Sequence, residues 1–309
     1  MAKTNALPTS LLEAVRYFSD IDVATEFVAK LRWPDGPVCP SCGGAEYSYL
    51  TTRRLWKCKN CKKQYSVKVG TIFEDSALGL DKWLPAVWLI ANSKNGISSH
   101  ELARALNTTQ KSAWFMLHRI RLAMRSQTFE MLSGHVEADE TYIGGKARNM
   151  KKGQRIEKTG EGRSTANKTP VLGMVERGGK VKARVVEDVK RTTLQSHVRD
   201  AVKPGSTLYT DALPSYTGLE RDYNHLTVNH AVTYVDGQVH TNVMENFWSL
   251  LKRGLHGTYI SVQPYHLFRY LDERAFTFNM RELTDLGRFT AVLSAVSGRR
   301  LTYDQLTGR

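Results

Sequence analysis

The stretch His135-Val-Glu-Ala-Asp-Glu-Thr-Tyr-Ile-Gly-Gly145 predicts a strand around which the main domain of this protein is built. Apolar residues alternate with Glu137 and Asp139, which is the period-two pattern of a half-buried strand. These two acids are therefore expected on one face of the strand, and Glu140 on the other. Such acids either lie on a solvated face or bind a metal ion. Taken alone, the stretch favours the solvated face, because unpaired buried carboxylates are costly.

The composition of the 309-residue chain allows two or three domains with a sizeable core. Its 44 Lys and Arg residues exceed its 30 Asp and Glu residues, and the net charge of +14 favours a polyanionic partner, nucleic acid before an anionic membrane. The longest apolar run, residues 83–91, is about half of what a bilayer-spanning helix requires. The N-terminus has no apolar signal-peptide core. We therefore expect an intracellular, cytoplasmic protein that does not bind membranes.

Two cysteine pairs of the type CxxC are separated by fifteen residues, and they are Cys39, Cys42, Cys58 and Cys61. This spacing predicts four thiolates that close a tetrahedron around Zn²⁺. Strand-like segments at residues 47–56 and 64–70 complete the pattern of a zinc ribbon. Two disulfides or a redox CxxC are the alternatives, and both are disfavoured by an intracellular location and by the doubled spacing. Because protein fills all four positions, the zinc is expected to be structural.

Helical patterns surround and follow this ribbon. Residues 9–31 predict two short helices, and residues 73–92 predict another. Ser98 or Ser99 caps a helix through Ala105, a turn follows, and residues 109–125 form a basic helix, which is the helix-turn-helix pattern. An ordinary helical hairpin with a solvated basic face is the alternative. The predicted DNA contacts of this helix are Gln110, Lys111, Ser112, Arg119 and Arg121.

From His135 onward the periodicity changes to strands. Strands are expected at 135–139, 171–175, 181–186, 207–211 and 225–229, and helices at 192–202 and 243–255. Residues 146–168 hold eight basic and two acidic residues, a net charge of +6, and predict a flexible arm that binds a polyanion through residues such as Lys151 and Lys152. The order of the elements is that of an α/β ribonuclease-H-like fold, in which the first and fourth strands lie side by side.

That fold would bring three acids together. Asp139 lies on the first strand, Asp211 ends the fourth, and Glu245 lies on the last helix, with Lys252 seven residues later on the same helical face. Phosphodiester chemistry requires neutralisation of charge on the attacking and leaving oxygens, which two Mg²⁺ ions provide. Mg²⁺ prefers carboxylate oxygens. Crowded carboxylates would otherwise repel one another and take up protons.

On these residues the chain resembles bacterial insertion-sequence transposases of the Asp-Asp-Glu superfamily, in the branch with an N-terminal zinc ribbon. The resemblance spans roughly residues 20–282 and is carried by residues 32–43, 136–146, 208–212, 240–259 and 269–279. It implies that Asp139, Asp211 and Glu245 bind Mg²⁺ or Mn²⁺ and that Lys252 contacts a phosphate. Some relatives have Asn at the third position, and Asn242 and Asn246 flank Glu245. The spacing to Lys252 and the charge favour Glu245.

The resemblance further implies a reaction. A water attacks the phosphodiester at the element end, and the 3′-hydroxyl that is released then attacks target DNA. The ribbon and the helix-turn-helix would bind terminal inverted repeats of double-stranded DNA, and the protein would act as a homodimer or larger assembly. The alternatives are a nuclease of the same fold that does not join strands, a non-catalytic zinc-ribbon regulator and a basic RNA-binding module. The expected division is 1–36 helices, 37–72 ribbon, 73–133 helix-turn-helix, 134–283 catalytic domain and 284–309 tail.

Overall fold

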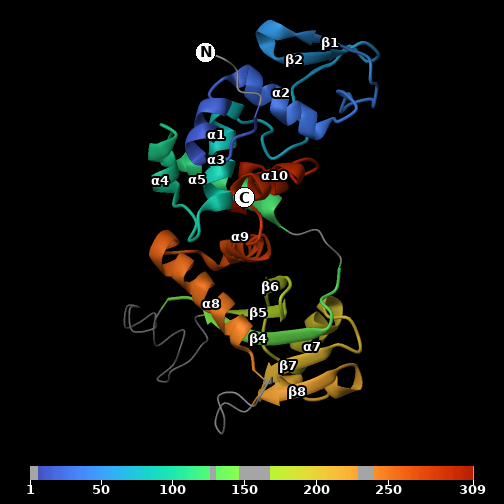
Figure 1. Ribbon diagram of the computed structural model, residues 1–309, viewed down its shortest axis with the longest axis vertical. Coiled ribbons are helices and arrows are strands. Elements are labelled where there is room, and N and C mark those ends of the chain that lie inside the picture. The colour runs from blue at the N-terminus through green and yellow to red at the C-terminus, as the bar shows by residue number, and fades with distance from the viewer. Residues whose placement is uncertain (1–5, 126–129, 146–167, 229–239, 309) are drawn as a thin grey trace. The chain divides into compact units, whose positions relative to one another are not determined.

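The computed structural model describes residues 6–125, 130–145, 168–228 and 240–308. The chain divides into two compact units, here called unit 1 (residues 1–125 and 280–309) and unit 2 (residues 126–279). Figure 1 colours the chain by residue number, from blue at the N-terminus to red at the C-terminus. Among the described residues, no helix combines the length and the apolar character that crossing a membrane requires.

Unit 1 consists of helices and one small sheet. The two N-terminal helices agree with the prediction, and each begins at a polar cap, Ser10 for the first and Asp20 for the second. The third helix begins at residue 80 rather than 73, because turns at Thr71 and Phe73 precede it. The helices are α1 (Leu11–Phe18), α2 (Ile21–Arg32), α3 (Leu80–Asn92), α4 (Ser99–Ala105), α5 (Gln110–Met124), α10 (Asp285–Ser294) and α11 (Tyr303–Thr307).

The small sheet of unit 1 is antiparallel, in the order β1-β2-β3, with strands β1 (Tyr47–Leu50), β2 (Leu55–Cys58) and β3 (Gln64–Tyr65). The third strand is shorter than the predicted segment 64–70. Val69 donates its backbone N–H to Ser66 and Thr71 donates to Lys68, so the chain turns instead of extending.

The C-terminal residues belong to unit 1. Phe289 of α10 packs against Phe18, Phe27 and Trp88, with ring centroids 5.5, 6.1 and 5.1 Å away. Further along, the N–H of Gly298 donates to the carbonyl of Gly70 at 2.8 Å. Two segments that are far apart in sequence therefore form one core.

Unit 2 contains a five-stranded sheet in the order β6-β5-β4-β7-β8. The first three strands pair antiparallel, and β4 with β7 and β7 with β8 pair parallel. The prediction that the first and fourth strands of this region lie side by side is confirmed. Strands β5 and β6 form a hairpin that turns at Gly178, whose φ is +75°. The strands are β4 (His135–Ile143), β5 (Thr169–Glu176), β6 (Val181–Val185), β7 (Thr207–Asp211) and β8 (Asn224–Val228).

Helices cover both faces of this sheet (Figure 1). On one face, α7 (Arg191–Ala201) packs through Leu194 and Val198 against Val136 and Ala138. On the other face lie α8 (Asn242–Gly254) and α9 (Leu267–Asn279), with cores formed by Phe247, Trp248, Leu251 and Leu271. β4 is therefore the central strand of a three-layer α/β unit, buried on both sides. Short 3₁₀ or π segments occupy Thr51–Arg53, Pro214–Tyr216, Leu219–Arg221, Leu255–Tyr259 and Pro264–His266.

Candidate active site and zinc-binding site

Two of the three predicted acids lie level with each other on neighbouring strands. His135 pairs with Thr207, and Glu137 pairs with Tyr209, so the parallel strands β4 and β7 are offset by 72 residues. Extended two residues beyond the last paired positions, the same offset brings Asp139 level with Asp211, where β7 ends, and the charge of Asp211 contributes to the raised pKa of Asp139. Paired positions of parallel strands face the same side of a sheet. The two carboxylates therefore project toward the face that α8 covers.

Helix α8 brings the third acid to this face. Trp248, one turn beyond Glu245, donates its indole N–H to a carboxylate oxygen of Asp139 at 2.8 Å. Gly173, the β5 partner of Asp139, makes room for this contact: a Cβ there would lie 2.3 Å from Met244 and 2.6 Å from the Trp248 ring. No local sequence pattern indicates that Trp248 contacts Asp139.

The electrostatics of the site are those of crowded acids. Burial raises the pKa of Asp139 to about 6; the Trp248 hydrogen bond opposes this shift, and the charges of Asp211 and Glu245 add to it. A cation beside these groups would favour their ionised forms. At pH 7 a carboxyl with a pKa of about 6 is mostly ionised, and a bound cation would offset the electrostatic cost of its charge.

Glu140 is a fourth acid at this site, and the sequence reading gave it no role. Burial, and to a smaller extent the charge of Asp211, raise the pKa of Glu140 to about 7. The hydroxyl of Tyr216 donates a hydrogen bond to the Glu140 carboxylate at 2.8 Å and opposes this shift. Tyr216 belongs to the α7-side core, so Glu140 faces away from α8 as the strand alternation predicted. In the sequence, the one sign that Glu140 belongs to this site is its position directly after Asp139.

The four cysteines of unit 1 form a compact metal-ligand set. The sulfurs of Cys39 and Cys61 lie 3.6 Å apart, as do those of Cys42 and Cys58. Tetrahedral Zn–S bonds of ~2.3 Å require sulfurs about 3.8 Å apart, whereas a disulfide requires about 2.05 Å. Backbone amides point at the sulfurs, and the N–H of Cys61 lowers the pKa of the Cys58 thiol. The donors therefore fit Zn²⁺.

The cysteines have ligand atoms that lie closer together than those of the acids on the sheet. Throughout the described parts of the chain, they are the one set of three or more His, Cys, Asp or Glu residues whose ligand atoms all lie within 4.8 Å of one another. Asp139, Asp211 and Glu245 are spread more widely, so their role as ligands stays a prediction.

The α4–α5 pair has the predicted boundaries. Ser98 caps α4 in a capping box with Glu101, and Thr109 caps α5 by accepting the N–H of Ser112. Between them, Asn107 adopts a positive φ of +47°. At the start of α5, Gln110 and Lys111 are exposed and Ser112 is partly exposed. These three side chains are accessible to a partner.

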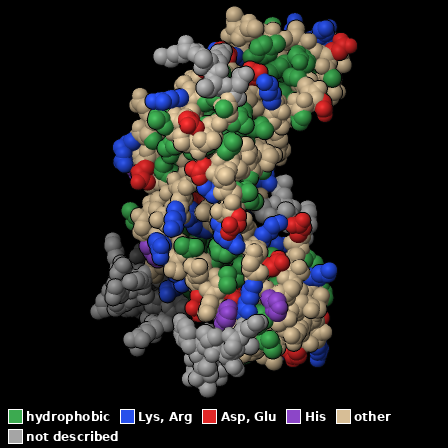
Figure 2. Space-filling model, viewed as in Figure 1, with side chains coloured by type: hydrophobic (Ala, Val, Ile, Leu, Met, Phe, Trp, Pro, Cys, Tyr) green, Lys and Arg blue, Asp and Glu red, His purple; other side chains and the backbone are tan. Residues whose placement is uncertain are grey.

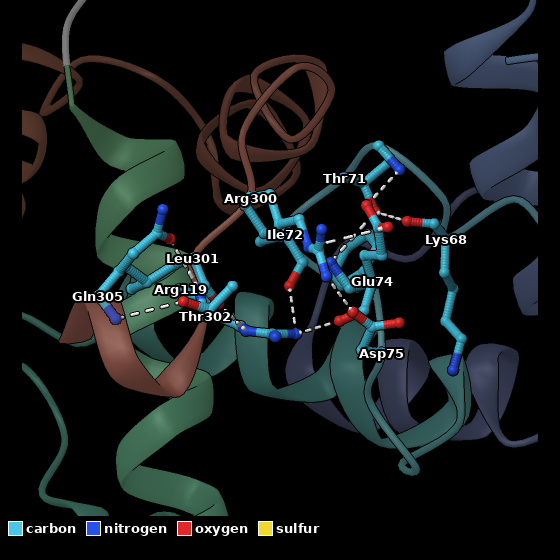
Figure 3. A network of polar contacts seen from close by, with 12 residues as sticks. Lys68, Thr71, Ile72, Glu74, Asp75, Arg119, Arg300, Leu301, Thr302 and Gln305 are labelled. Carbon is cyan, nitrogen blue, oxygen red and sulfur yellow. Dashed lines mark hydrogen bonds and ion pairs between the residues drawn. The ribbon is translucent and has the colours of Figure 1, made fainter. Parts of the chain in front are cut away.

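The prediction that Arg119 and Arg121 contact DNA is wrong for this structure, because both are buried, with 4% and 1% exposure. The guanidinium of Arg119 donates to the carbonyl oxygens of Leu301 and Ile72, both at 3.0 Å, and of Glu74 at 2.6 Å (Figure 3). Arg119 therefore joins α5 to the C-terminal tail. Spacing along a helix gives its basic residues but not which of them face the core.

Three further lysines were predicted to contact DNA. Lys252 is exposed in the last turn of α8, and Lys151 and Lys152 lie outside the described residues. On the face that Figure 2 shows, Lys and Arg side chains are distributed over both units with acids among them. The net positive charge is therefore not gathered into one patch on that face.

Comparison with known proteins identifies the class. A family model described as an ISXO2-like transposase domain matches residues 131–279, and a transposase zinc-ribbon domain matches residues 20–64. An uncharacterized protein in transposable element ISH50 of Halobacterium salinarum is 30% identical over 247 residues, which cover 75% of this chain and 82% of that protein. An uncharacterized transposase-like protein of Haemophilus influenzae is 33% identical over 105 residues, 34% of this chain and 85% of that protein.

These matches cover both the cysteine cluster and the acid-bearing sheet, so the class is that of insertion-sequence transposases. Within it, the chain belongs to the ISXO2-like transposases that carry a zinc ribbon. The resemblance drawn from the sequence motifs is confirmed.

Proposed function

We propose that this protein is the DNA transposase of an insertion sequence, which cleaves the element ends and joins them to target DNA in metal-dependent reactions. The observation that carries the proposal is the level placement of Asp139 and Asp211 on the parallel strands β4 and β7, beneath the helix that bears Glu245. The strand order supports assignment to the ribonuclease-H-like fold, because three antiparallel strands are followed by two parallel ones.

Asp139, Asp211 and Glu245 would hold Mg²⁺ or Mn²⁺, because their carboxylates are the hard oxygen donors that these ions prefer. The pKa of Asp139 is raised mainly by burial and further by the charges of the other two acids, a repulsion that a bound cation would relieve. When bound, the metal ions supply charge neutralisation at the attacking and leaving oxygens. Trp248 fixes the orientation of the Asp139 carboxylate through one oxygen. Lys252, exposed on the same helix, would contact a DNA phosphate.

Unit 1 would bind the terminal inverted repeats. The α4–α5 pair is interpreted as a helix-turn-helix, with Gln110, Lys111 and Ser112 at the exposed start of the second helix. The cysteine cluster would hold a structural Zn²⁺, because four protein thiolates leave no open position. A homodimer or larger assembly would bring two element ends together.

A cleavage and joining assay tests the proposal. It uses the full chain, Mg²⁺ and labelled DNA from the ends of the flanking element, with Asp211→Asn as the variant. We expect joined product that requires the metal, and a loss of about 100-fold or more in Asp211→Asn, the scale of removing one preorganised polar group that stabilises a transition state.

The other outcomes identify the alternatives. Metal-dependent cleavage that leaves a supplied 3′-hydroxyl end unjoined would indicate a nuclease of the same fold. Binding of DNA without any metal-dependent product would indicate a non-catalytic zinc-ribbon regulator. Preference for RNA over duplex DNA would indicate an RNA-binding module.

A further inference from the structure

Glu137 is a fully buried carboxylate, with 0% exposure, that caps α8 from a neighbouring strand. One of its oxygens accepts the backbone N–H groups of Val243 at 2.9 Å and Met244 at 3.1 Å, in the first turn of α8. Thr241, which occupies the N-cap position, makes no side-chain capping bond. Glu137 thus satisfies N–H groups that a helix start otherwise leaves unpaired, and its charge opposes the helix dipole.

The second oxygen of Glu137 is held by a cation. The Nε of Arg177 donates to it at 2.8 Å, and Nδ1 of His240 lies 3.3 Å away. Arg177 also donates to the carbonyl of His240 at 2.8 Å, and its guanidinium stacks 3.9 Å from the centre of the Tyr209 ring. These contacts join β4, the β5–β6 turn, β7 and the start of α8. A carboxylate this deeply buried is tolerated only when it is paired in this way.

The position of this cluster relates it to the acids. Glu137 and Asp139 are two residues apart on β4, and both contact α8: Glu137 its first turn, and Asp139 the indole of Trp248. The two contacts fix both the height and the rotation of the helix on the sheet. Glu245 lies between the two contact points along α8, and its charge acts on Asp139.

We infer that Glu137, clamped by Arg177 and His240, is a positioning residue that holds α8 so that the carboxylate of Glu245 meets those of Asp139 and Asp211. The inference rests on the proposed function, since Glu245 has no known task without it. Residues that orient metal ligands typically change metal affinity or activity 10- to 100-fold when they are replaced.

The test uses Glu137→Gln in the full chain. Glutamine keeps the shape but not the charge, and an amide that caps α8 turns its NH₂ group toward Arg177. We expect the Mg²⁺ concentration for half-maximal product to rise about 10-fold or more, with DNA affinity unchanged. Calorimetric binding of Mn²⁺ to the protein alone should weaken by a similar factor. Arg177→Gln should shift both quantities in the same direction.

Glu273→Gln is the matched control. Glu273 is also 0% exposed and also forms a buried ion pair, with Arg274 at 2.6 Å, but it lies on α9 away from the start of α8. If Glu137→Gln leaves the Mg²⁺ requirement and Mn²⁺ affinity at wild-type values, or if Glu273→Gln shifts them equally, the inference is overturned.

Amide hydrogen exchange separates this inference from the proposed function. The N–H groups of Val243 and Met244 should exchange faster in Glu137→Gln and at the wild-type rate in Glu273→Gln. If the wild type forms no product and binds no Mn²⁺, the proposed function fails, and with it the role of Glu137 toward Glu245. Faster exchange would then show only that Glu137 anchors α8.

Discussion

At the scale of single residues, Glu140 and Asp139 are carboxyls that the folded chain keeps in an unfavourable setting. Their pKa values, about 7 and about 6, lie above the ordinary values of 4.5 and 3.8, first because of burial. A carboxyl with a raised pKa binds more protons in the folded than in the unfolded state between the two values. The free energy of unfolding of the metal-free protein should therefore fall as pH rises from about 4 to about 7.

Replacement of Glu140 tests whether the free energy of unfolding falls as pH rises. Glu140→Gln removes the charge and keeps an acceptor for Tyr216, so we expect a melting temperature of unit 2 about 3 °C or more above wild type at pH 8, and little change at pH 4. The measurement is thermal unfolding in a chelator of divalent ions.

Asp188→Asn is the control with the opposite sign. The hydroxyl of Thr193, followed by contacts with Lys190, lowers the pKa of Asp188 to about 2. Ionised Asp188 therefore stabilises the fold at neutral pH, and this stabilisation is lost as pH falls toward 2. The Asp188→Asn variant should melt at a lower temperature than wild type at pH 8. Equal shifts of Glu140→Gln at pH 4 and pH 8 would contradict the prediction.

At the scale of elements, the contact between α8 and the sheet depends on the missing side chain of Gly173. Gly173→Ala would place a methyl group 2.3 Å from the end of the Met244 side chain and 2.6 Å from the Trp248 ring, so these side chains or α8 itself would have to shift. We expect a loss of about 1–3 kcal/mol in the free energy of unfolding of unit 2, together with reduced strand joining. Denaturant unfolding and the joining assay measure the two effects.

Gly257→Ala is the control for that substitution, because a Cβ there meets nothing within 4 Å and it lies in the same unit. It should leave unfolding nearly unchanged. Equal stability of the two variants would show that the packing of α8 does not depend on Gly173.

Helix α5 presents a second element-scale prediction, because its basic residues have different environments. Lys111 is exposed, with its ammonium 4.9 Å from the centre of the Tyr303 ring, whereas Arg119 is buried among backbone carbonyls. Lys111→Ala should weaken binding of terminal-repeat DNA and reduce the slope of log affinity against log salt by about 1. Arg119→Met should lower the melting temperature of unit 1, because it leaves buried carbonyls without a donor.

Affinity measured at several salt concentrations, well below both melting temperatures, distinguishes the two residues. A salt slope that changes in Arg119→Met but not in Lys111→Ala would reverse the assignment.

At the scale of the whole molecule, the chain leaves unit 1 at residue 125 and returns to it at residue 280. The tail then pairs with the segment after the ribbon: Thr71 bridges to Ser297, and Arg300 forms an ion pair with Asp75 at 2.5 Å. A chain that ends at Ala295 loses these partners, and also the Leu301 carbonyl that accepts from Arg119.

We expect this truncation to destabilise unit 1 by several kcal/mol, since each buried polar group left unpaired costs about 1–3 kcal/mol. Limited proteolysis should then cut residues 6–125 faster and leave the sheet of unit 2 as resistant as before. Equal protection of unit 1 in both chains would show that the tail is dispensable.

The sequence by itself determined the local features of this protein. Four cysteines at CxxC spacing, the strand alternation around Asp139, the order of strands and helices, and Asp211 at a strand end are encoded within short windows. Periodicity and ligand spacing are read directly from such windows. The order of the elements, through the fold it matches, predicted the neighbouring strands β4 and β7. The resemblance carried by the motifs around Asp139, Asp211 and Glu245 predicted the transposase family.

Only the tertiary structure decided which side chains meet across the chain. Trp248 contacts Asp139 from 109 positions away, Met244 donates to Glu137 from 107, and Arg119 reaches Leu301 across 182. No local pattern records such pairs, because they depend on how whole elements pack. That packing buried two residues that were predicted to contact DNA and placed the tail in unit 1. It also made Glu137, for which the sequence predicted no partner, the cap of the helix that carries the third acid.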